Sequence, residues 1–320
     1  MTIKVAVIGY GHLGKWHCQK VDLFHSEEKG KQAVLAYIVD PVEKNRELAK
    51  ANHPQTKVVA HLSECLHDID AGVVVTPTSF QFEIVKILLE NNKHVFCEKP
   101  LTENQKQALE LKYIHQQKNL VLQVGHSERF HNAWEMKEAY ADYFKAPAHI
   151  NLRRVAPFKG RATDVDVVSD LMIHDLDLLV FLFKEVPLTV DSIGYKMRTN
   201  KFDYMSSHFK FKSGHRAQIT VGRNQTKEVR ELEISNTTGT LMIDLMKNEI
   251  IEARGSFDGP EFTKTIPYEK RDHLLLEHQY FYQSIKNHTP PIVNIDDGIM
   301  AVKLIDKVIE SAVLGTEVLI

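Results

Sequence analysis

Two hydrophobic patterns follow one another along the chain and change near residue 125. Before that point, short apolar runs alternate with longer stretches of helical periodicity, which predicts a parallel sheet built from βαβ units. The expected strands are 3–8, 34–39, 57–59, 72–75, 93–97 and 120–124, and the expected helices are 12–25, 41–51, 80–91 and 103–117. Asp40-Pro41 and Thr102 are the helix start signals. Residues 1–123 are therefore predicted to form a domain built on a parallel sheet.

The later pattern is that of long alternating strands around a few helices. Apolar and polar residues alternate strictly on either side of two turn signals, Ser213-Gly214 and Thr238-Gly239. This pattern predicts a mostly antiparallel open sheet with one buried face and one face free to meet water or a second subunit. The expected helices are 169–183, 272–286 and 296–313. Residues 124–320 are therefore predicted to form a second α/β domain.

The composition argues against nucleic acid, membranes and metal ions as partners of this protein. The chain has 320 residues, 43% of them hydrophobic, and a formal charge of -2, so it has no overall basic field for nucleic acid or an anionic membrane. No apolar run approaches the ~18 residues that span a bilayer, and no signal peptide precedes the first strand pattern. Cys18, Cys65 and Cys97 form no CxxC pair, so we expect reduced thiols, a cytoplasmic protein and no metal site.

A glycine motif stands where the first predicted strand meets the first predicted helix. Gly9-Tyr10-Gly11-His12-Leu13-Gly14 is a GxGxxG, in which the glycines allow a tight turn, close approach of a pyrophosphate and close helix packing. Asp40, at the end of the second strand, is placed to bind a ribose and to repel a 2′-phosphate, which favours NAD over NADP. The alternatives are a glycine turn without ligand and Asp40 as a helix cap before Pro41.

A lysine stands at the carboxyl end of a predicted buried strand. Glu98-Lys99-Pro100 directly follows the apolar run 94–97, and Pro100 stops the strand and favours an extended Lys99. Ligands of open α/β sheets bind outside the carboxyl ends of the strands, so the Lys99 ammonium is expected to project towards the ligand. The alternative is a surface lysine in a tight turn.

A later helix pattern combines carboxylates with a histidine. Asp170, His174 and Asp177 are spaced i, i+4 and i+7 in a helix whose remainder is almost wholly apolar, so a carboxylate can orient the imidazole. Such an imidazole can exchange a proton with a substrate hydroxyl. The alternatives are a core histidine with Asp170 as a cap, and metal ligands that lack a third and fourth partner at a familiar spacing. Hydride transfer from an alcohol needs groups of this kind, so Lys99, Asp170 and His174 are the predicted catalytic residues.

The ordered motifs resemble those of the glucose–fructose oxidoreductase, inositol dehydrogenase and rhizopine catabolism family (Gfo/Idh/MocA) over nearly the whole chain. Besides the glycine motif, Asp170 and His174, they are Thr76-Pro77-Thr78, His94 to Pro100, and Gly125-His126 with Arg129-Phe130. The resemblance implies that residues 1–123 form a Rossmann dinucleotide-binding domain and that a nicotinamide cofactor binds there. It also implies that residues 124–320 form a substrate-binding and oligomerisation domain, with a large open sheet that often forms dimers. It also implies cofactor contacts at Thr76, Pro77, Glu98 and Lys99, and substrate contacts at Lys99, His126, Arg129, Asp170 and His174. Gln81 departs from the histidine that is usual in this family.

A basic stretch precedes the predicted Asp/His helix. Residues 153–161 carry four cations, and together with residues 164–171 they resemble the UDP-N-acetylglucosamine 3-dehydrogenases within this family. Such cations can clamp a diphosphate or carboxylate, so Arg154 and Arg161 are predicted to bind substrate. The alternative is a solvated basic loop. Lys159-Gly160 and Asp166 depart from the pattern of that branch.

The sequence as a whole predicts an NAD-preferring dehydrogenase, with NADP as the alternative cofactor. Its substrate would be a ring hydroxyl of a sugar, sugar nucleotide or cyclitol. His174 is the expected base, Asp170 its orienting partner, and Lys99 a hydrogen-bond donor to the reacting hydroxyl, although family members differ over which residue takes the proton first. A homodimer or homotetramer through the open sheet is expected. The rivals are a non-catalytic dinucleotide-binding regulator and a reductase of C=C or C=N bonds.

Overall fold

The computed structural model describes residues 2–26, 30–160, 162–255 and 262–320. The chain divides into two compact units, Met1–Ser127 with Asp272–Val302, and Glu128–Arg271 with Lys303–Ile320. The sequence-based division at residue 123 kept each domain continuous and did not include the return of 272–302 to the first unit. That return has a physical reason, because Phe281 and Tyr282 of this segment are fully buried in the hydrophobic core of the first unit.

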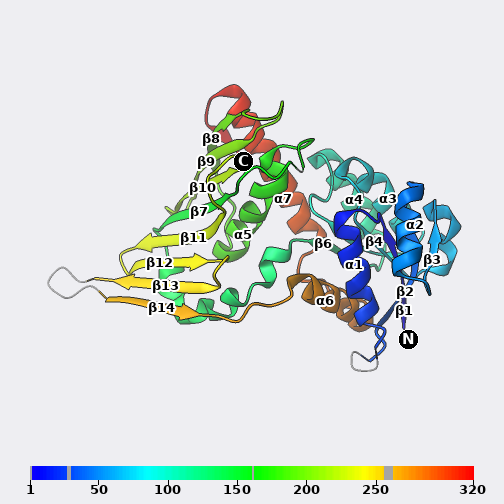
Figure 1. The fold of residues 1–320 in the computed structure, drawn as a ribbon. Coiled ribbons are helices and arrows are strands. Elements are labelled where there is room, and N and C mark those ends of the chain that lie inside the picture. Colours follow the sequence, from blue (N-terminus) through cyan, green and yellow to red (C-terminus); the bar gives the residue numbers. More distant parts are fainter. Residues whose placement is uncertain (1, 27–29, 161, 256–261) are drawn as a thin grey trace. The chain divides into compact units, whose positions relative to one another are not determined.

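The first unit is built on a six-stranded parallel sheet in the order β3-β2-β1-β4-β5-β6 (Figure 1). Its strands are β1 (Ile3–Ile8), β2 (Ala33–Val39), β3 (Lys57–Val59), β4 (Ala71–Val74), β5 (His94–Glu98) and β6 (Leu122–Gly125). Its helices are α1 (His12–Leu23), α2 (Glu43–Asn52), η1 (Leu62–Glu64), η2 (Leu66–Asp68), α3 (Thr78–Glu90), α4 (Gln105–Gln116) and α6 (His273–Asn287). Helix α7 (Ile295–Leu314) begins in this unit and ends in the second.

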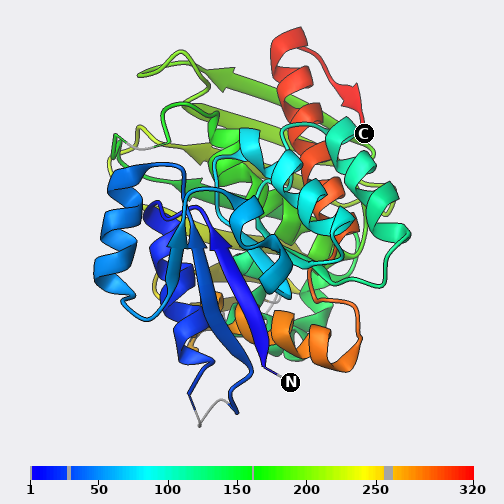
Figure 2. The same ribbon diagram turned by 90° about the vertical axis from the view of Figure 1, so that its right-hand side faces the viewer.

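Burial explains why these strands read as continuous apolar runs. Val5, Val7, Val73 and Phe96 are fully buried, as expected for parallel strands with helices on both faces. Helix α1 packs against α6 and helix α3 against α4, and Figures 1 and 2 show α1 and α6 side by side. The predicted parallel sheet is confirmed, with strand ends shifted by one or two residues at most places.

Both predicted helix start signals are wrong. Helix α2 begins at Glu43, with Val42 as its cap, instead of at Pro41. Helix α4 begins at Gln105 instead of near Thr102, because Asn104 is its cap and accepts a hydrogen bond from the Gln107 N–H at 3.1 Å. The Thr102 hydroxyl donates to the carbonyl oxygen of Asn104 at 2.9 Å instead of capping the helix itself. An asparagine and a threonine are both good caps, so the composition of this turn did not separate them.

The second unit is built on a nine-stranded sheet in the order β14-β13-β12-β11-β7-β10-β9-β8-β15, with only β7 and β10 parallel among the described pairs. Its strands are β7 (His149–Val155), β8 (Thr189–Tyr195), β9 (Tyr204–Lys210), β10 (Arg216–Gly222), β11 (Val229–Asn236), β12 (Gly239–Asp244), β13 (Glu249–Arg254), β14 (Phe262–Pro267) and β15 (Val318–Leu319). Its helical segments are η4 (Asn132–Phe144), η5 (Val168–Met172) and α5 (Ile173–Phe183), and η3 (Ser127–Phe130) lies at the junction of the units.

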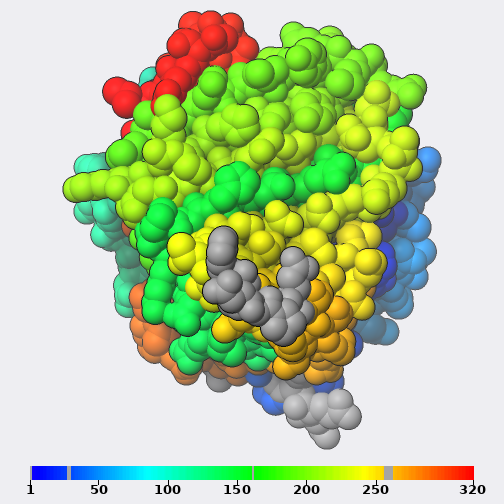
Figure 3. All heavy atoms as spheres, turned by 90° about the vertical axis from the view of Figure 1, so that its left-hand side faces the viewer, coloured from blue at the N-terminus to red at the C-terminus, as the bar shows by residue number. Residues whose placement is uncertain are grey.

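The two faces of this sheet differ as the alternation predicted. Ile150 and Leu152 of β7 and Ile219 of β10 are buried on one face, while Asn151 and Gln218 lie on the other. Figure 3 shows side chains of the strands at the molecular surface of this unit. The mostly antiparallel open sheet is therefore confirmed. Within the described residues, we find no helix with the length and apolar character that a membrane span requires.

Candidate active site

The glycine loop between β1 and α1 has the close contacts that the motif predicts. Gly9 has a φ of +99°, and a Cβ added there would lie 2.7 Å from the carbonyl oxygen of Val75. A Cβ at Gly14 would lie 2.0 Å from the carbonyl oxygen of Gly9, so α1 can approach β1 only with glycine at this position. A Cβ at Gly11 would meet nothing within 4 Å. The loop therefore has no room for a side chain at Gly9 or Gly14, whereas the space beside Gly11 is open.

A cavity of about 620 Å³ lies at the carboxyl edge of the first sheet. It brings together five of the predicted cofactor residues, Gly9, Gly11, Asp40, Thr76 and Pro77. His12 and Leu13 directly follow Gly11 of the cavity wall and are exposed at the first turn of α1. Asn45, His61 and Phe80 also line the cavity and were missed, since none belongs to a recognisable motif.

The Asp40 carboxylate is held firmly at the cavity wall. It accepts hydrogen bonds from the backbone N–H of Tyr10 at 2.8 Å, from the backbone N–H of Val42 at 2.8 Å and from the Asn45 amide at 3.1 Å. Asp40 is only 4% exposed. Val42 is itself the N-cap residue of α2, and this helix has no side-chain cap, so the alternative of Asp40 as the helix cap is wrong. The place of Asp40 in the cavity wall supports the ribose role.

The geometry of the first unit is suited to binding a dinucleotide. The open space at Gly11 leaves the backbone accessible to a pyrophosphate, at the N-terminus of α1 where unpaired N–H groups favour anions. The buried Thr76 hydroxyl oxygen has no hydrogen-bond partner in the structure and lies on a residue of the cavity wall. Gly9, Gly11, Asp40 and Thr76 would hold the cofactor, which when bound supplies the hydride-accepting nicotinamide.

Removing the charge of Asp40 should change the choice of cofactor. We expect Asp40→Asn to shift the ratio of NADP+ to NAD+ affinity about tenfold towards NADP+, or ~1.4 kcal/mol, because the amide keeps the shape and loses the repulsion of a 2′-phosphate. Equilibrium binding of both cofactors to the two proteins measures this ratio. Equal affinity of the natural protein for NAD+ and NADP+ would contradict the role of Asp40.

Glu98 and Lys99 lie at the carboxyl end of β5, as predicted. Lys99 is half-buried, the Lys99-Pro100 peptide is cis, and the Lys99 N–H donates to the Glu98 carboxylate at 3.2 Å. Gln81 is buried, and its amide donates to the carbonyl oxygens of Thr76 at 3.3 Å and Glu98 at 3.2 Å. Gln81, the departure from the family pattern, thus ties two predicted cofactor segments together. His126 follows β6 and is 1% exposed.

The predicted Asp170/His174 helix contains a change of helix type. Asp170 lies in η5, which is a π-helical turn, and His174 lies in the first turn of α5. A π-turn holds more residues than an α-turn, so the i, i+4 alignment expected from an ideal α-helix does not apply unchanged. Both residues are half-buried in the second unit. Upstream, the Asp166 carboxylate anchors the segment by accepting from the Phe202 N–H at 2.6 Å.

Arg129 and Asp177 form a buried ion pair. The Arg129 guanidinium donates to both carboxylate oxygens of Asp177, at 2.8 and 2.6 Å, and lies over the ring of Phe181. The two side chains are 5% and 2% exposed. Asp177 therefore anchors η3 to α5, and the guanidinium predicted to bind substrate is engaged by this carboxylate.

Arg154 is the centre of a buried charge cluster. Its guanidinium donates to Glu128 at 2.9 Å and to Asp175 at 2.9 to 3.2 Å. Burial by itself raises the pKa of Glu128, but the charge of Arg154 and a hydrogen bond from His131 outweigh it and hold that pKa well below its ordinary value. Burial raises the pKa of Asp175, and Arg154 offsets only part of this effect. His174 also acts electrostatically on Glu128.

Sequence reasoning missed Glu128 and Asp175. The alternation along β7 was the available signal for this cluster, because it places Arg154 on the same buried face as Ile150 and Leu152. A buried arginine requires carboxylate partners, but the sequence does not say which ones.

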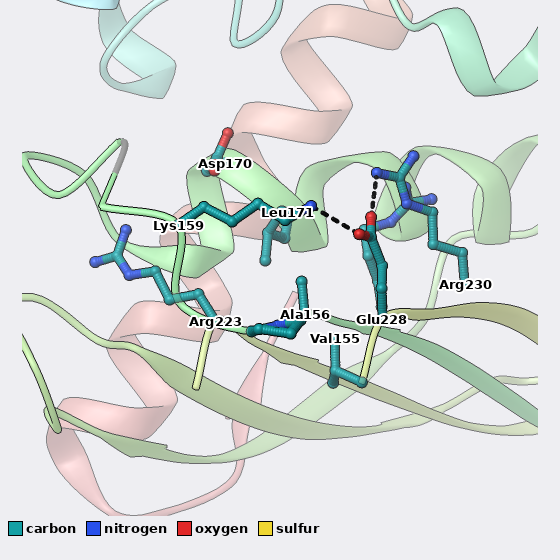
Figure 4. A pocket seen from close by; sticks show the side chains of 10 residues that line it. Val155, Ala156, Lys159, Asp170, Leu171, Arg223, Glu228 and Arg230 are labelled. Atoms are coloured by element: carbon teal, nitrogen blue, oxygen red, sulfur yellow. Dashed lines mark hydrogen bonds and ion pairs between the residues drawn. The ribbon is translucent and has the colours of Figure 1, made fainter. Parts of the chain in front are cut away.

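A small pocket of about 50 Å³ in the second unit joins Asp170 to several cations. Figure 4 shows Glu228 between Lys159 and Arg230, with ion pairs of 2.7 and 3.1 Å. Arg154 and Arg223 also line this pocket. Arg161, predicted to bind substrate, lies outside the described residues. The structure thus brings Asp170 together with Arg154 around one pocket, while Lys99 and His126 belong to the first unit.

No metal centre emerges from this geometry. Among the side chains that the structure describes, no group of three or more His, Cys, Asp or Glu is placed to hold a metal ion.

The glycine loop, the acid at the end of β2 and the cavity at the carboxyl edge of a parallel sheet define a dinucleotide-binding α/β protein with a second, open-sheet unit. The chain belongs to the Gfo/Idh/MocA family. Residues 3–126 match the oxidoreductase family with an NAD-binding Rossmann fold, and residues 142–242 match the Gfo/Idh/MocA C-terminal domain. The protein is an NAD-dependent dehydrogenase, which confirms the predicted family, fold class and cofactor.

Named relatives include two curated enzymes. The chain is 30% identical over 295 residues, 90% of each chain, to the UDP-N-acetylglucosamine 3-dehydrogenase of Acidithiobacillus ferrooxidans. It is 26% identical over 93% of each chain to the scyllo-inositol 2-dehydrogenase (NAD(+)) of Bacillus subtilis.

Solved structures show the same fold. A structure of the A. ferrooxidans UDP-N-acetylglucosamine 3-dehydrogenase superimposes with a TM-score of 0.88 at 27% identity, over 98% of this chain and 99% of that chain. A levoglucosan dehydrogenase in complex with NADH and L-sorbose gives a TM-score of 0.88 at 17% identity, over 100% and 99% of the chains. The second likeness concerns the fold alone.

Proposed function

We propose that this dehydrogenase oxidises a secondary ring hydroxyl of a sugar nucleotide, of the kind named for the A. ferrooxidans relative. The observation that carries the proposal is the pocket that joins Asp170 to Lys159 and Arg230. A cationic wall beside a predicted catalytic carboxylate suits a sugar that carries a diphosphate. Free sugars and cyclitols have no such anion and are the alternative substrates.

The chain's own residues have defined parts in the proposed reaction. Lys99 donates a hydrogen bond to the reacting hydroxyl oxygen, and His174 takes its proton, with Asp170 as the orienting carboxylate. His126 contacts the sugar. The cofactor is held by Gly9, Gly11, Gly14 and Asp40, and by the exposed first turn of α1 at His12 and Leu13, with Thr76, Pro77 and Glu98 at neighbouring strand ends.

The cations divide into two groups by their partners. Arg129, Arg154 and Arg223 are buried and paired with carboxylates, so they shape the second unit instead of offering a free charge. Lys159 and Arg230 are 46% and 38% exposed and share Glu228, so an incoming phosphate can replace this carboxylate as their partner. Lys159 and Arg230 are therefore the proposed diphosphate ligands.

A substrate panel tests the proposal. UDP-N-acetylglucosamine, free N-acetylglucosamine and myo-inositol are compared for NADH formation, with an aminotransferase present to remove a keto product. We expect kcat/KM to be about 100-fold higher for the sugar nucleotide, since charge-assisted hydrogen bonds are worth ~1.5–3 kcal/mol each. Lys159→Gln should raise KM for the sugar nucleotide and leave that for a free sugar unchanged. Preference for inositol, or turnover of none of the three, would overturn the assignment.

The assembly and compartment are part of the same proposal. Ile193 and Tyr195 on the open face of β8 expose 59% and 54% of their surface, which supports a homodimer or homotetramer through this sheet. Cys18, Cys65 and Cys97 are buried free thiols, which suits a reducing cytoplasm. Light scattering of the purified protein checks the oligomeric state.

A further inference from the structure

Four polar side chains form a continuous hydrogen-bonded chain inside the first unit. Nε2 of His17 on α1 lies 3.0 Å from a carboxylate oxygen of Glu98, and Nδ1 of His17 lies 3.0 Å from Nε2 of His278 on α6. Nδ1 of His278 lies 3.0 Å from the hydroxyl of Tyr282. His17, His278 and Tyr282 are fully buried and Glu98 is 9% exposed. None of the three buried members belongs to the motifs that identify the family.

Aromatic rings enclose the inner end of this chain. The ring of His278 stacks on Phe96 with centroids 5.4 Å apart, and Phe24 packs on Tyr282. Burial lowers the pKa of His278 well below its ordinary value, and it raises the pKa of Tyr282 well above its own. Both side chains are therefore neutral at physiological pH.

The donors and acceptors assign one direction to the chain. A Glu98 carboxylate only accepts, so Nε2 of His17 donates to it. The Tyr282 hydroxyl lies among aromatic rings, so it donates to Nδ1 of His278. Neutral His278 then carries its proton on Nε2 and donates to Nδ1 of His17. All three hydrogen bonds thus point towards Glu98.

Glu98 has little freedom to move from this position. A Cβ added at Gly125 of β6 would lie 2.9 Å from its carboxyl carbon, so β6 passes directly against the carboxylate. The second carboxylate oxygen accepts from the Lys99 N–H at 3.2 Å. A negative charge is therefore fixed at the carboxyl end of β5, beside the lysine proposed to act on the substrate.

We propose that His17, supported by His278 and Tyr282, is a positioning residue that holds the Glu98 carboxylate towards the nicotinamide and thereby favours NAD+ over NADH. The nicotinamide ring is cationic in NAD+ and neutral in NADH, so a nearby carboxylate attracts only the oxidised form. The inference rests on the proposed function, in which Lys99 contacts the reacting hydroxyl and therefore lies beside the nicotinamide that accepts the hydride. It concerns cofactor binding, and no substrate enters it.

Equilibrium binding of NAD+ and NADH, without substrate, tests the proposal. In His17→Leu the carboxylate loses its buried donor, so we expect the Kd of NAD+ to rise about tenfold and that of NADH to change less than about twofold. His17→Gln keeps an N–H donor near the position of Nε2 and should keep the natural ratio. Glu98→Gln should show the same selective loss as His17→Leu, and the double variant should lose no more than either one.

Other outcomes would overturn the inference. An equal rise of both Kd values in His17→Leu would mean that His17 only supports the fold, and additive losses in the double variant would mean that it does not act through Glu98. If His17→Leu does not fold by circular dichroism, His278→Leu and His278→Gln repeat the comparison one step further along the chain. His115→Leu, which alters a histidine bound to the carbonyl oxygen of Leu120, is the matched control and should change neither Kd. A wrong substrate assignment leaves all these values unchanged, so the two proposals fail separately.

Discussion

Lys99→Ala should lower kcat by about a thousandfold while NAD+ still binds within about twofold of its natural Kd. Lys99 is half-buried at the carboxyl end of β5, where a ligand of a parallel sheet binds. Its ammonium is proposed to donate to the reacting oxygen, and alanine leaves this oxygen without a donor as the proton departs. Because Lys99 is only half-buried, its replacement should lower the free energy of unfolding less than the replacement of a fully buried side chain would. Steady-state kinetics and a separate binding measurement distinguish the two effects.

A lysine at the opposite end of the same strand is the matched control. Lys93 precedes β5, and its ammonium donates to the carbonyl oxygen of Ile69 at 2.7 Å. Lys93→Ala should leave kcat near its natural value. Near-normal turnover of Lys99→Ala would remove the lysine from the mechanism and leave His174 as the base. The pH profile of kcat in His174→Asn would then show whether the histidine takes the proton.

Arg154→Met should be the most destabilising single substitution proposed for this chain, at about 3–5 kcal/mol of unfolding free energy. The side chains of Arg154, Glu128 and Asp175 are each less than 10% exposed, so methionine leaves two carboxylates in a low-dielectric environment without their cation. The length of methionine preserves most of the packing, so the loss reports charge. Urea unfolding monitored by circular dichroism measures it.

Two comparisons separate this effect from general damage. Adding Glu128→Gln and Asp175→Asn to Arg154→Met removes the uncompensated charges and should recover a large part of the lost stability. Lys145→Met breaks an exposed pair with Asp142, whose side chains are 73% and 61% exposed, and should cost less than about 1 kcal/mol. A loss for Arg154→Met no larger than that for Lys145→Met would contradict the role of the buried cluster.

Residues whose partners are close in the sequence were predicted well. The glycine motif, the strand ends at Asp40 and Glu98, and the turn at Ser213-Gly214 depend on local conformation and on short periodicity, which a sequence displays directly. The cavity that unites Gly9, Gly11, Asp40, Thr76 and Pro77 agrees with the predicted parallel sheet, because parallel strands end at one edge.

Residues whose partners are remote in the sequence could not be assigned. Arg129 and Arg154 were predicted to bind substrate, and their carboxylate partners Asp177, Glu128 and Asp175 meet them only after folding. The helix carrying Asp170 was expected to be α-helical throughout, and the π-turn of η5 changes its geometry. A spacing rule describes an ideal helix, and it has no means of placing an irregular turn.

By itself the sequence determined the family, the parallel and open sheets, and the dinucleotide site, because each depends on periodicity or on residue types at short spacing. Only the tertiary structure decided which charges are paired, that residues 272–302 complete the core of the first unit, and that His278 and Tyr282 reach His17 and Glu98. The physical reason is the same in each case. The energy of a buried polar group depends on the neighbours that surround it, and folding alone brings those neighbours together.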